Sequence, residues 1–182
     1  MSKLLIILFI IIVLLIVMGI LYIYYYNKFN ETIIRVNEAE CRIDDNLRDK
    51  YDILSKCVTL VKDNAKVDDD AFKSLAMLKT KKLSNFEFDR ELVKSHNELI
   101  TIFDANKKLK DNDELCRSMK QLELIDEELV TLRTYYNANI TNYNKMVKKI
   151  PTIIVAKIKK YKERMFYDLK DMTDDNYEDF KL

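Results

Sequence analysis

The chain has 182 residues, with 31 lysines and arginines against 30 aspartates and glutamates, so it is close to neutral. A neutral chain produces no broad positive field, which argues against nucleic-acid binding. It contains only one glycine and one proline. The turns of sheet proteins and flexible linkers require more of these residues. We therefore expect an all-α protein of long helices with short connections.

Residues 4–26 contain no charged side chain and no amide. At about 1.5 Å per residue, a helix of this length matches the roughly 30 Å hydrocarbon core of a bilayer. The segment ends in four closely spaced tyrosines, which favour the membrane interface: Tyr22, Tyr24, Tyr25 and Tyr26. A cleaved signal peptide has a shorter apolar region and a small-residue cleavage site. We predict an uncleaved transmembrane anchor over residues 1–26.

The charges beside this anchor indicate its orientation. Lys3 and the amino terminus lie on one side, whereas Lys28, Arg35 and Arg42 follow on the other. Lysine and arginine are enriched on the cytoplasmic side of membrane helices. We therefore expect a short N-terminus outside the membrane and the bulk of the chain in the cytoplasm. The difference is small, so the opposite orientation stays open.

Beyond the anchor, apolar side chains recur at steps of three or four, as on one face of a helix. Four segments show this spacing: residues 29–61, 72–83, 88–103 and 115–150. The first is expected to continue the anchor helix without a break. The four together predict an up-and-down four-helix bundle on an N-terminal transmembrane helix, followed by a short C-terminal amphipathic helix.

Polar residues mark the ends of these segments. The aspartates at positions 68–70 are expected to cap the second helix. Ser84 and Glu87 have the spacing of a capping box at the start of the third helix. Pro151 should end the fourth helix, because the residue before a proline is pushed out of the helical conformation.

The segment after Pro151 is basic and amphipathic. Residues 153–165 alternate apolar side chains with five basic ones: Lys157, Lys159, Lys160, Lys162 and Arg164. Such a cluster beside a membrane helix contacts anionic headgroups at about 1 kcal/mol per basic residue. The other interpretation, in which the apolar face packs on the bundle and the lysines are solvated, stays open. Residues 168–182 are acidic and poor in apolar residues, and we expect a disordered tail.

The sequence predicts no catalytic, cofactor or metal site. His96 has no cysteine or carboxylate three or four residues after it, and a surface position is expected. Cys41, Cys57 and Cys116 are widely spaced and are expected to be buried, reduced thiols. Phosphate-binding loops and nucleophile elbows need glycines that the chain lacks. We therefore expect a protein that is not an enzyme.

Two blocks of the sequence resemble the LemA family. The first is RVNEAECRIDDNLRDKYDILSKCVTLVK, and the second is RTYYNANITNYNKMVKKIPTIIVAKIKKYKERMFYD. The residues that match the family pattern in the first block are Ala39, Ile43, Asp44, Leu47, Tyr51 and Asp52. Those that match in the second block are Tyr136, Asn137, Tyr143, Asn144 and Pro151. The chain departs from the pattern at Glu40, Ser55 and Asp63, where the family usually has Trp, Pro and Gly.

The resemblance implies a helical bundle on a single anchor in a bacterial cell membrane, and it brings no catalytic residue with it. The expected organisation is an anchor over 1–26, a LemA-like bundle over 27–167 and an acidic tail over 168–182. We expect a non-catalytic interaction or scaffold role with membrane and protein partners. The alternative is a lipid-contacting or envelope-stress module that uses residues 153–165.

Overall fold

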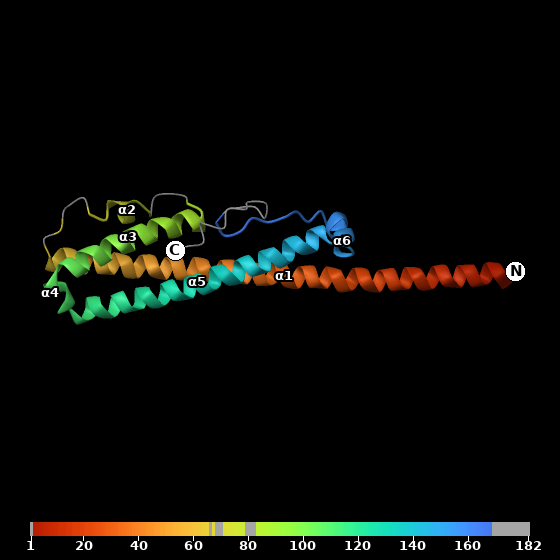
Figure 1. The fold of residues 1–182 in the computed structure, drawn as a ribbon, viewed down its shortest axis with the longest axis horizontal. Coiled ribbons are helices and arrows are strands. Elements are labelled where there is room, and N and C mark those ends of the chain that lie inside the picture. Colours follow the sequence, from red (N-terminus) through yellow and green to blue (C-terminus); the bar gives the residue numbers. More distant parts are fainter. Residues whose placement is uncertain (1, 66, 68–70, 79–82, 169–182) are drawn as a thin grey trace. The chain divides into compact units, whose positions relative to one another are not determined.

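The computed structural model describes residues 2–65, 67, 71–78 and 83–168 (Figure 1). Within these ranges the chain is largely helical and has no strand, which confirms the all-α prediction. The elements in order are α1 (Ser2–Asn64), α2 (Lys73–Met77), α3 (Asn85–Ala105), α4 (Lys107–Lys110), α5 (Asp113–Lys148) and α6 (Thr152–Lys159). The caps expected at positions 68–70 and the acidic tail from residue 169 onward lie outside the described residues.

Helix α1 runs without a break for 63 residues, as the sequence predicts. No proline lies within it to remove a backbone hydrogen bond. Its N-terminal part is long and apolar enough to cross a membrane, and none of its most apolar window is buried inside the structure. The large apolar side chains of that part, from Leu4 to Leu21, are exposed.

The described residues fall into two compact units. The first, called the anchor-side unit, contains residues 2–38 and 137–166. The second, called the leucine unit, contains residues 39–136 and 167–168. Both α1 and α5 contribute residues to each unit.

The leucine unit is built on side chains of α1, α3 and α5 that recur at helical spacing, together with one from α4. Its fully buried leucines are Leu47, Leu54, Leu92, Leu99, Leu109, Leu115, Leu122 and Leu129. The described helix α2 covers five of the residues 72–83 over which the apolar pattern predicts a helix. Phe72 precedes it with a φ of 64°, a left-handed conformation that no helix continues through. Its side chain is nevertheless buried in the core.

Local polar contacts fix the ends of the other helices. Ser84 and Glu87 form the predicted capping box: the Ser84 hydroxyl accepts from the Glu87 amide at 3.3 Å, and the Glu87 carboxylate accepts from the Ser84 amide at 3.0 Å. Asn112 caps the start of α5, because its side-chain oxygen accepts hydrogen bonds from the amides of Glu114 and Leu115. These contacts satisfy amides that a helix start leaves without partners.

The anchor-side unit has a smaller core of aromatic and aliphatic side chains. Its buried members are Phe29, Tyr143, Met146, Val155 and Ala156. Helix α5 ends at Lys148, ahead of Pro151, as predicted. Helix α6 then begins at Thr152, whose hydroxyl donates to the Lys149 carbonyl at 2.8 Å.

Candidate functional site

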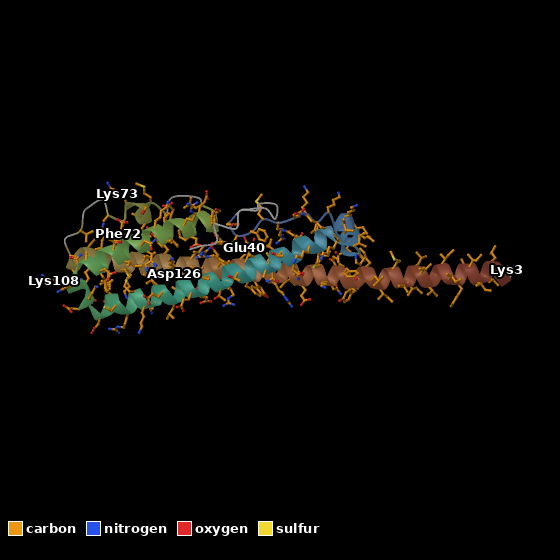
Figure 2. The ribbon with its side chains drawn as sticks, in the orientation of Figure 1. Lys3, Glu40, Phe72, Lys73, Lys108 and Asp126 are labelled. Atoms are coloured by element: carbon orange, nitrogen blue, oxygen red, sulfur yellow. The ribbon has the colours of Figure 1, made fainter. Side chains whose placement is uncertain are left out.

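The leucine unit contains a buried ionic group centred on Asp126 of α5, which Figure 2 labels. Lys50 of α1 is completely buried, and its ammonium donates to Asp126 Oδ1. His96 of α3 meets Asp126 Oδ2 through Nδ1 at 2.9 Å. Burial pushes the pKa of Asp126 upward, but the hydrogen bonds from His96 and Lys50 outweigh it and hold that pKa below its usual range. Asp126 is thus kept as a carboxylate.

The expected surface position of His96 is wrong, because its side chain is only 6% exposed. A buried imidazole needs a partner, and Asp126 lies 30 residues away in the sequence, beyond the spacing that a local search covers. The other ring nitrogen of His96, Nε2, is buried with no hydrogen-bond partner among the described residues.

A second ionic group in the same unit joins Asp89, Arg133 and Tyr167. The Arg133 guanidinium lies 3.0 Å from Asp89 Oδ2, and the Tyr167 hydroxyl donates to the same oxygen at 3.2 Å. Burial raises the pKa of Asp89, although Arg133 and Lys50 oppose the rise and Asp126 adds to it. The pKa of Tyr167 is also raised, first by burial and then by the negative charge of Asp89.

Sequence reasoning missed these ionic groups as a site, although the sequence contains a signal for them. Each of these polar residues takes a place in an apolar helical series, three or four positions from buried leucines. Lys50 lies between Leu47 and Leu54, His96 between Leu92 and Leu99, and Asp126 between Leu122 and Leu129. A charged residue at a core position of a helix predicts a buried partner on another helix.

The chemistry of this site is mutual neutralisation. The Asp126 carboxylate accepts a hydrogen bond from Lys50, and the Asp89 carboxylate accepts one from Arg133. Buried ion pairs of this kind are weak contributors to stability, but they discriminate strongly against arrangements that separate the partners. We infer that these two ionic groups determine which helices pack together.

The three cysteines are free, and they differ in exposure. Cys57 is buried, and burial raises its pKa to about 11. Cys41 is exposed and Cys116 is half-buried, so the expectation of three buried thiols is correct only for Cys57. Cys41 follows buried Ala39 by two residues and precedes buried Ile43 by two, which places it on the opposite side of the helix.

The LemA-like residues of the first block lie along α1. Three of them are buried in the interior: Ala39, Ile43 and Leu47. Asp44 forms an exposed ion pair with Arg48 at 2.6 Å, and Asp52 is exposed. The half-buried Tyr51 ring lies 6.0 Å from the Phe88 ring. Glu40, which stands where the family usually has Trp, is exposed on α1 and labelled in Figure 2.

The LemA-like residues of the second block lie on α5 and just after it. Tyr136, in the leucine unit, has its ring 6.2 Å from that of Tyr167. Asn137 is half-buried, and its carbonyl accepts from the Thr141 hydroxyl. Pro151 is exposed between α5 and α6.

Tyr143 and Asn144 have defined roles inside the anchor-side unit. The Tyr143 ring packs edge-on against Phe29 at 5.9 Å. Asn144 is buried, and its side-chain amide donates to the Arg164 carbonyl at 2.8 Å and accepts from the Arg164 amide at 2.9 Å. One asparagine side chain therefore holds the backbone that follows α6.

The basic residues that the sequence associates with lipid differ in their surroundings. Lys157, Lys160 and Lys162 are exposed. Lys159 is exposed too, but its ammonium lies 4.6 Å from the centre of the Tyr26 ring. Arg164 is half-buried and has its guanidinium 5.3 Å from the Tyr143 ring. The structure thus brings Lys159 and Arg164 into cation–π contacts within the chain.

Comparison with known families adds one result. A model of the LemA family matches residues 39–178. No curated protein and no solved structure matches the chain. The family match covers more than half of the sequence and includes all the LemA-like residues described above, from Ala39 to Pro151. The chain therefore belongs to the LemA family.

Proposed function

We propose that this chain is a single-pass membrane protein whose helical part is a non-catalytic interaction or scaffold domain. The anchor is the apolar part of α1, where exposed aliphatic side chains would contact lipid. The neighbouring charges support an orientation with the short N-terminus outside and the helical part in the cytoplasm of a bacterial cell.

The observation that carries the scaffold role is the pairing inside the leucine unit. Its ionisable core residues contact one another, which suits them to hold helices together. The same unit also exposes large apolar side chains on α5, where Leu124 is 63% and Val130 is 52% exposed. Six positions place these two side chains about 120° apart around the helix, so each offers a separate apolar contact to another protein.

The test is site-specific photocrosslinking of the full chain in its native membrane. A photoreactive residue at Leu124 should form a defined protein adduct, whereas one at the exposed Glu40 serves as the control on α1. Turnover of a substrate by the purified protein, or the absence of adducts at Leu124, would overturn the scaffold proposal.

A second candidate function is contact with anionic lipid or an envelope-stress role through residues 153–165. It is favoured by the exposure of Lys157, Lys160 and Lys162, because lysines near a bilayer attract anionic headgroups. The test is the phosphatidylglycerol content of lipid that copurifies with the full chain. Replacing these three lysines with Gln should lower the ratio of phosphatidylglycerol to phosphatidylcholine in that lipid. A ratio equal to that of the wild type would contradict the lipid role.

A further inference from the structure

The outward face of α6 is apolar. Thr152, Val155 and Ala156 are buried against the core of the anchor-side unit. The opposite side carries Ile154 and Ile158, which are 47% and 59% exposed, and Ile150 just before the helix is 85% exposed. Ile154 and Ile158 are four residues apart on α6 and form one ridge, which we call the isoleucine ridge. Ile150 precedes this ridge, outside the helix. A helix that is apolar on both sides requires a second apolar environment.

The position of α6 on α1 indicates what that environment is. The Lys159 ammonium lies 4.6 Å from the Tyr26 ring, and the Tyr161 ring lies 5.1 Å from the Phe29 ring. Figure 1 shows α6 beside α1 where the exposed N-terminal part of that helix begins. Tyr26 is the last residue of the apolar stretch, so α6 is held at the level where the spanning segment leaves the hydrocarbon.

The charges around the ridge favour an anionic surface. Exposed lysines precede and follow it in the sequence: Lys149 lies before α6, and Lys157 and Lys160 lie near its C-terminal end. Glu163 is the acidic residue of the segment 145–164, and it is paired with Lys148 at 2.8 Å. Isoleucines beside exposed lysines match the boundary between acyl chains and anionic headgroups. A purely apolar or a purely acidic protein surface would match only one of these two kinds of side chain.

We propose that α6 is an interfacial helix in which the isoleucine ridge enters the boundary between headgroups and acyl chains, while Lys149, Lys157 and Lys160 contact the phosphates of anionic phospholipids. This inference rests on the proposed membrane anchor. It assigns the lipid contact to the ridge of Ile154 and Ile158, and it removes Lys159 and Arg164 from the contact, because they lie on the rings of Tyr26 and Tyr143.

The test measures the depth of nitroxide labels on the full chain in vesicles of phosphatidylcholine with phosphatidylglycerol. The background carries Cys41→Ser and Cys116→Ser and keeps the buried Cys57, which must take up no label by itself. Single cysteines then replace Ile154, Ile158, Ile34 or Val13. Ile34 is the matched control, because it is also an exposed isoleucine, at 56%, but lies two turns beyond Tyr26. Val13 reports on the anchor.

Labels at Ile154 and Ile158 should be more accessible to oxygen than to a water-soluble nickel chelate, whereas the label at Ile34 should show the reverse. Adding Lys157→Gln and Lys160→Gln should move the Ile154 label toward water in the mixed vesicles but not in phosphatidylcholine alone. Aqueous labels at both Ile154 and Ile158 with a deep label at Val13 would overturn the interfacial helix and leave the anchor standing. An aqueous label at Val13 would overturn the anchor itself.

Discussion

Asn144 joins the last turns of α5 to the backbone of Arg164 through two hydrogen bonds, at 2.8 and 2.9 Å, one in each direction. The side-chain amide acts here as a backbone amide does between two strands. Because Asn144 is buried, removal of the side chain leaves both backbone groups of Arg164 without this partner.

Replacing Asn144 with Ala should therefore lower the free energy of unfolding by about 2 kcal/mol. The measurement is denaturant unfolding of the full chain in detergent, followed by circular dichroism. Asn142→Ala, an exposed position on the same helix, is the control and should be close to neutral. Equal stability of the two variants would show that the hydrogen bonds to Arg164 contribute little.

Replacing Asp126 with Ala should destabilise the leucine unit by about 3 kcal/mol, because the Lys50 ammonium would stay buried without its partner. The figure is at the low end of the range for such pairs, since the Asp126 side chain is 35% exposed. Adding Lys50→Met should recover part of the loss. If the double variant loses as much stability as the two single variants together, the coupling between Lys50 and Asp126 is refuted. Glu123→Ala, on the exposed side of α5, is the control.

The capping box at Ser84 should contribute to the stability of the chain in a pH-dependent way. Hydrogen bonds from the Ser84 amide and hydroxyl lower the pKa of Glu87. A lowered folded-state pKa means that this stabilisation is complete above the unfolded pKa and is lost as the pH falls through the folded one. Glu87→Gln keeps a capping side chain but does not titrate. Its melting temperature should fall less than that of the wild type between about pH 5 and pH 3.

The two proteins should melt at similar temperatures near neutral pH, which is the internal control for this comparison. Identical slopes of melting temperature against pH would contradict the role of the Ser84 hydrogen bonds. The Glu87 carboxyl can also be followed directly by NMR, and Ser84→Ala should raise its pKa.

Cys57 should be inert toward thiol reagents in the folded protein. With a pKa of about 11, roughly one molecule in a thousand carries the thiolate near pH 8, and burial also blocks access. Alkylation of the native chain, read by mass spectrometry, should modify Cys41 first and Cys57 only after denaturation. Rapid labelling of Cys57 in the native chain would show that the leucine unit opens readily.

Local patterns predict much of this fold. Ser84 and Glu87 start a helix within four residues of each other, and Pro151 acts on the residues next to it. The partners of the buried charges could not be predicted in this way. Lys50 and Asp126 are 76 residues apart, and their contact depends on which faces of α1 and α5 pack together. Periodicity shows which side chains face a core, but it does not identify the helix on the other side of that core.

The start of the second helix also escaped local analysis. The apolar spacing of Phe72, Leu75 and Leu78 fits a longer helix, yet the described part is a single turn after a left-handed residue. All three side chains are buried, so the apolar pattern predicted burial correctly, while the described helix covers Lys73–Met77 of the expected range.

The complete burial of Lys50 has a consequence for how such sequences diverge. A neutral residue at position 126 leaves a buried cation, and a neutral residue at position 50 leaves Asp126 with His96 alone. Substitutions at these two positions should therefore arise together in descendants of this sequence, and an apolar pair there would also require a change at His96, whose partner is Asp126. Lineages that lose one charge should soon lose the other.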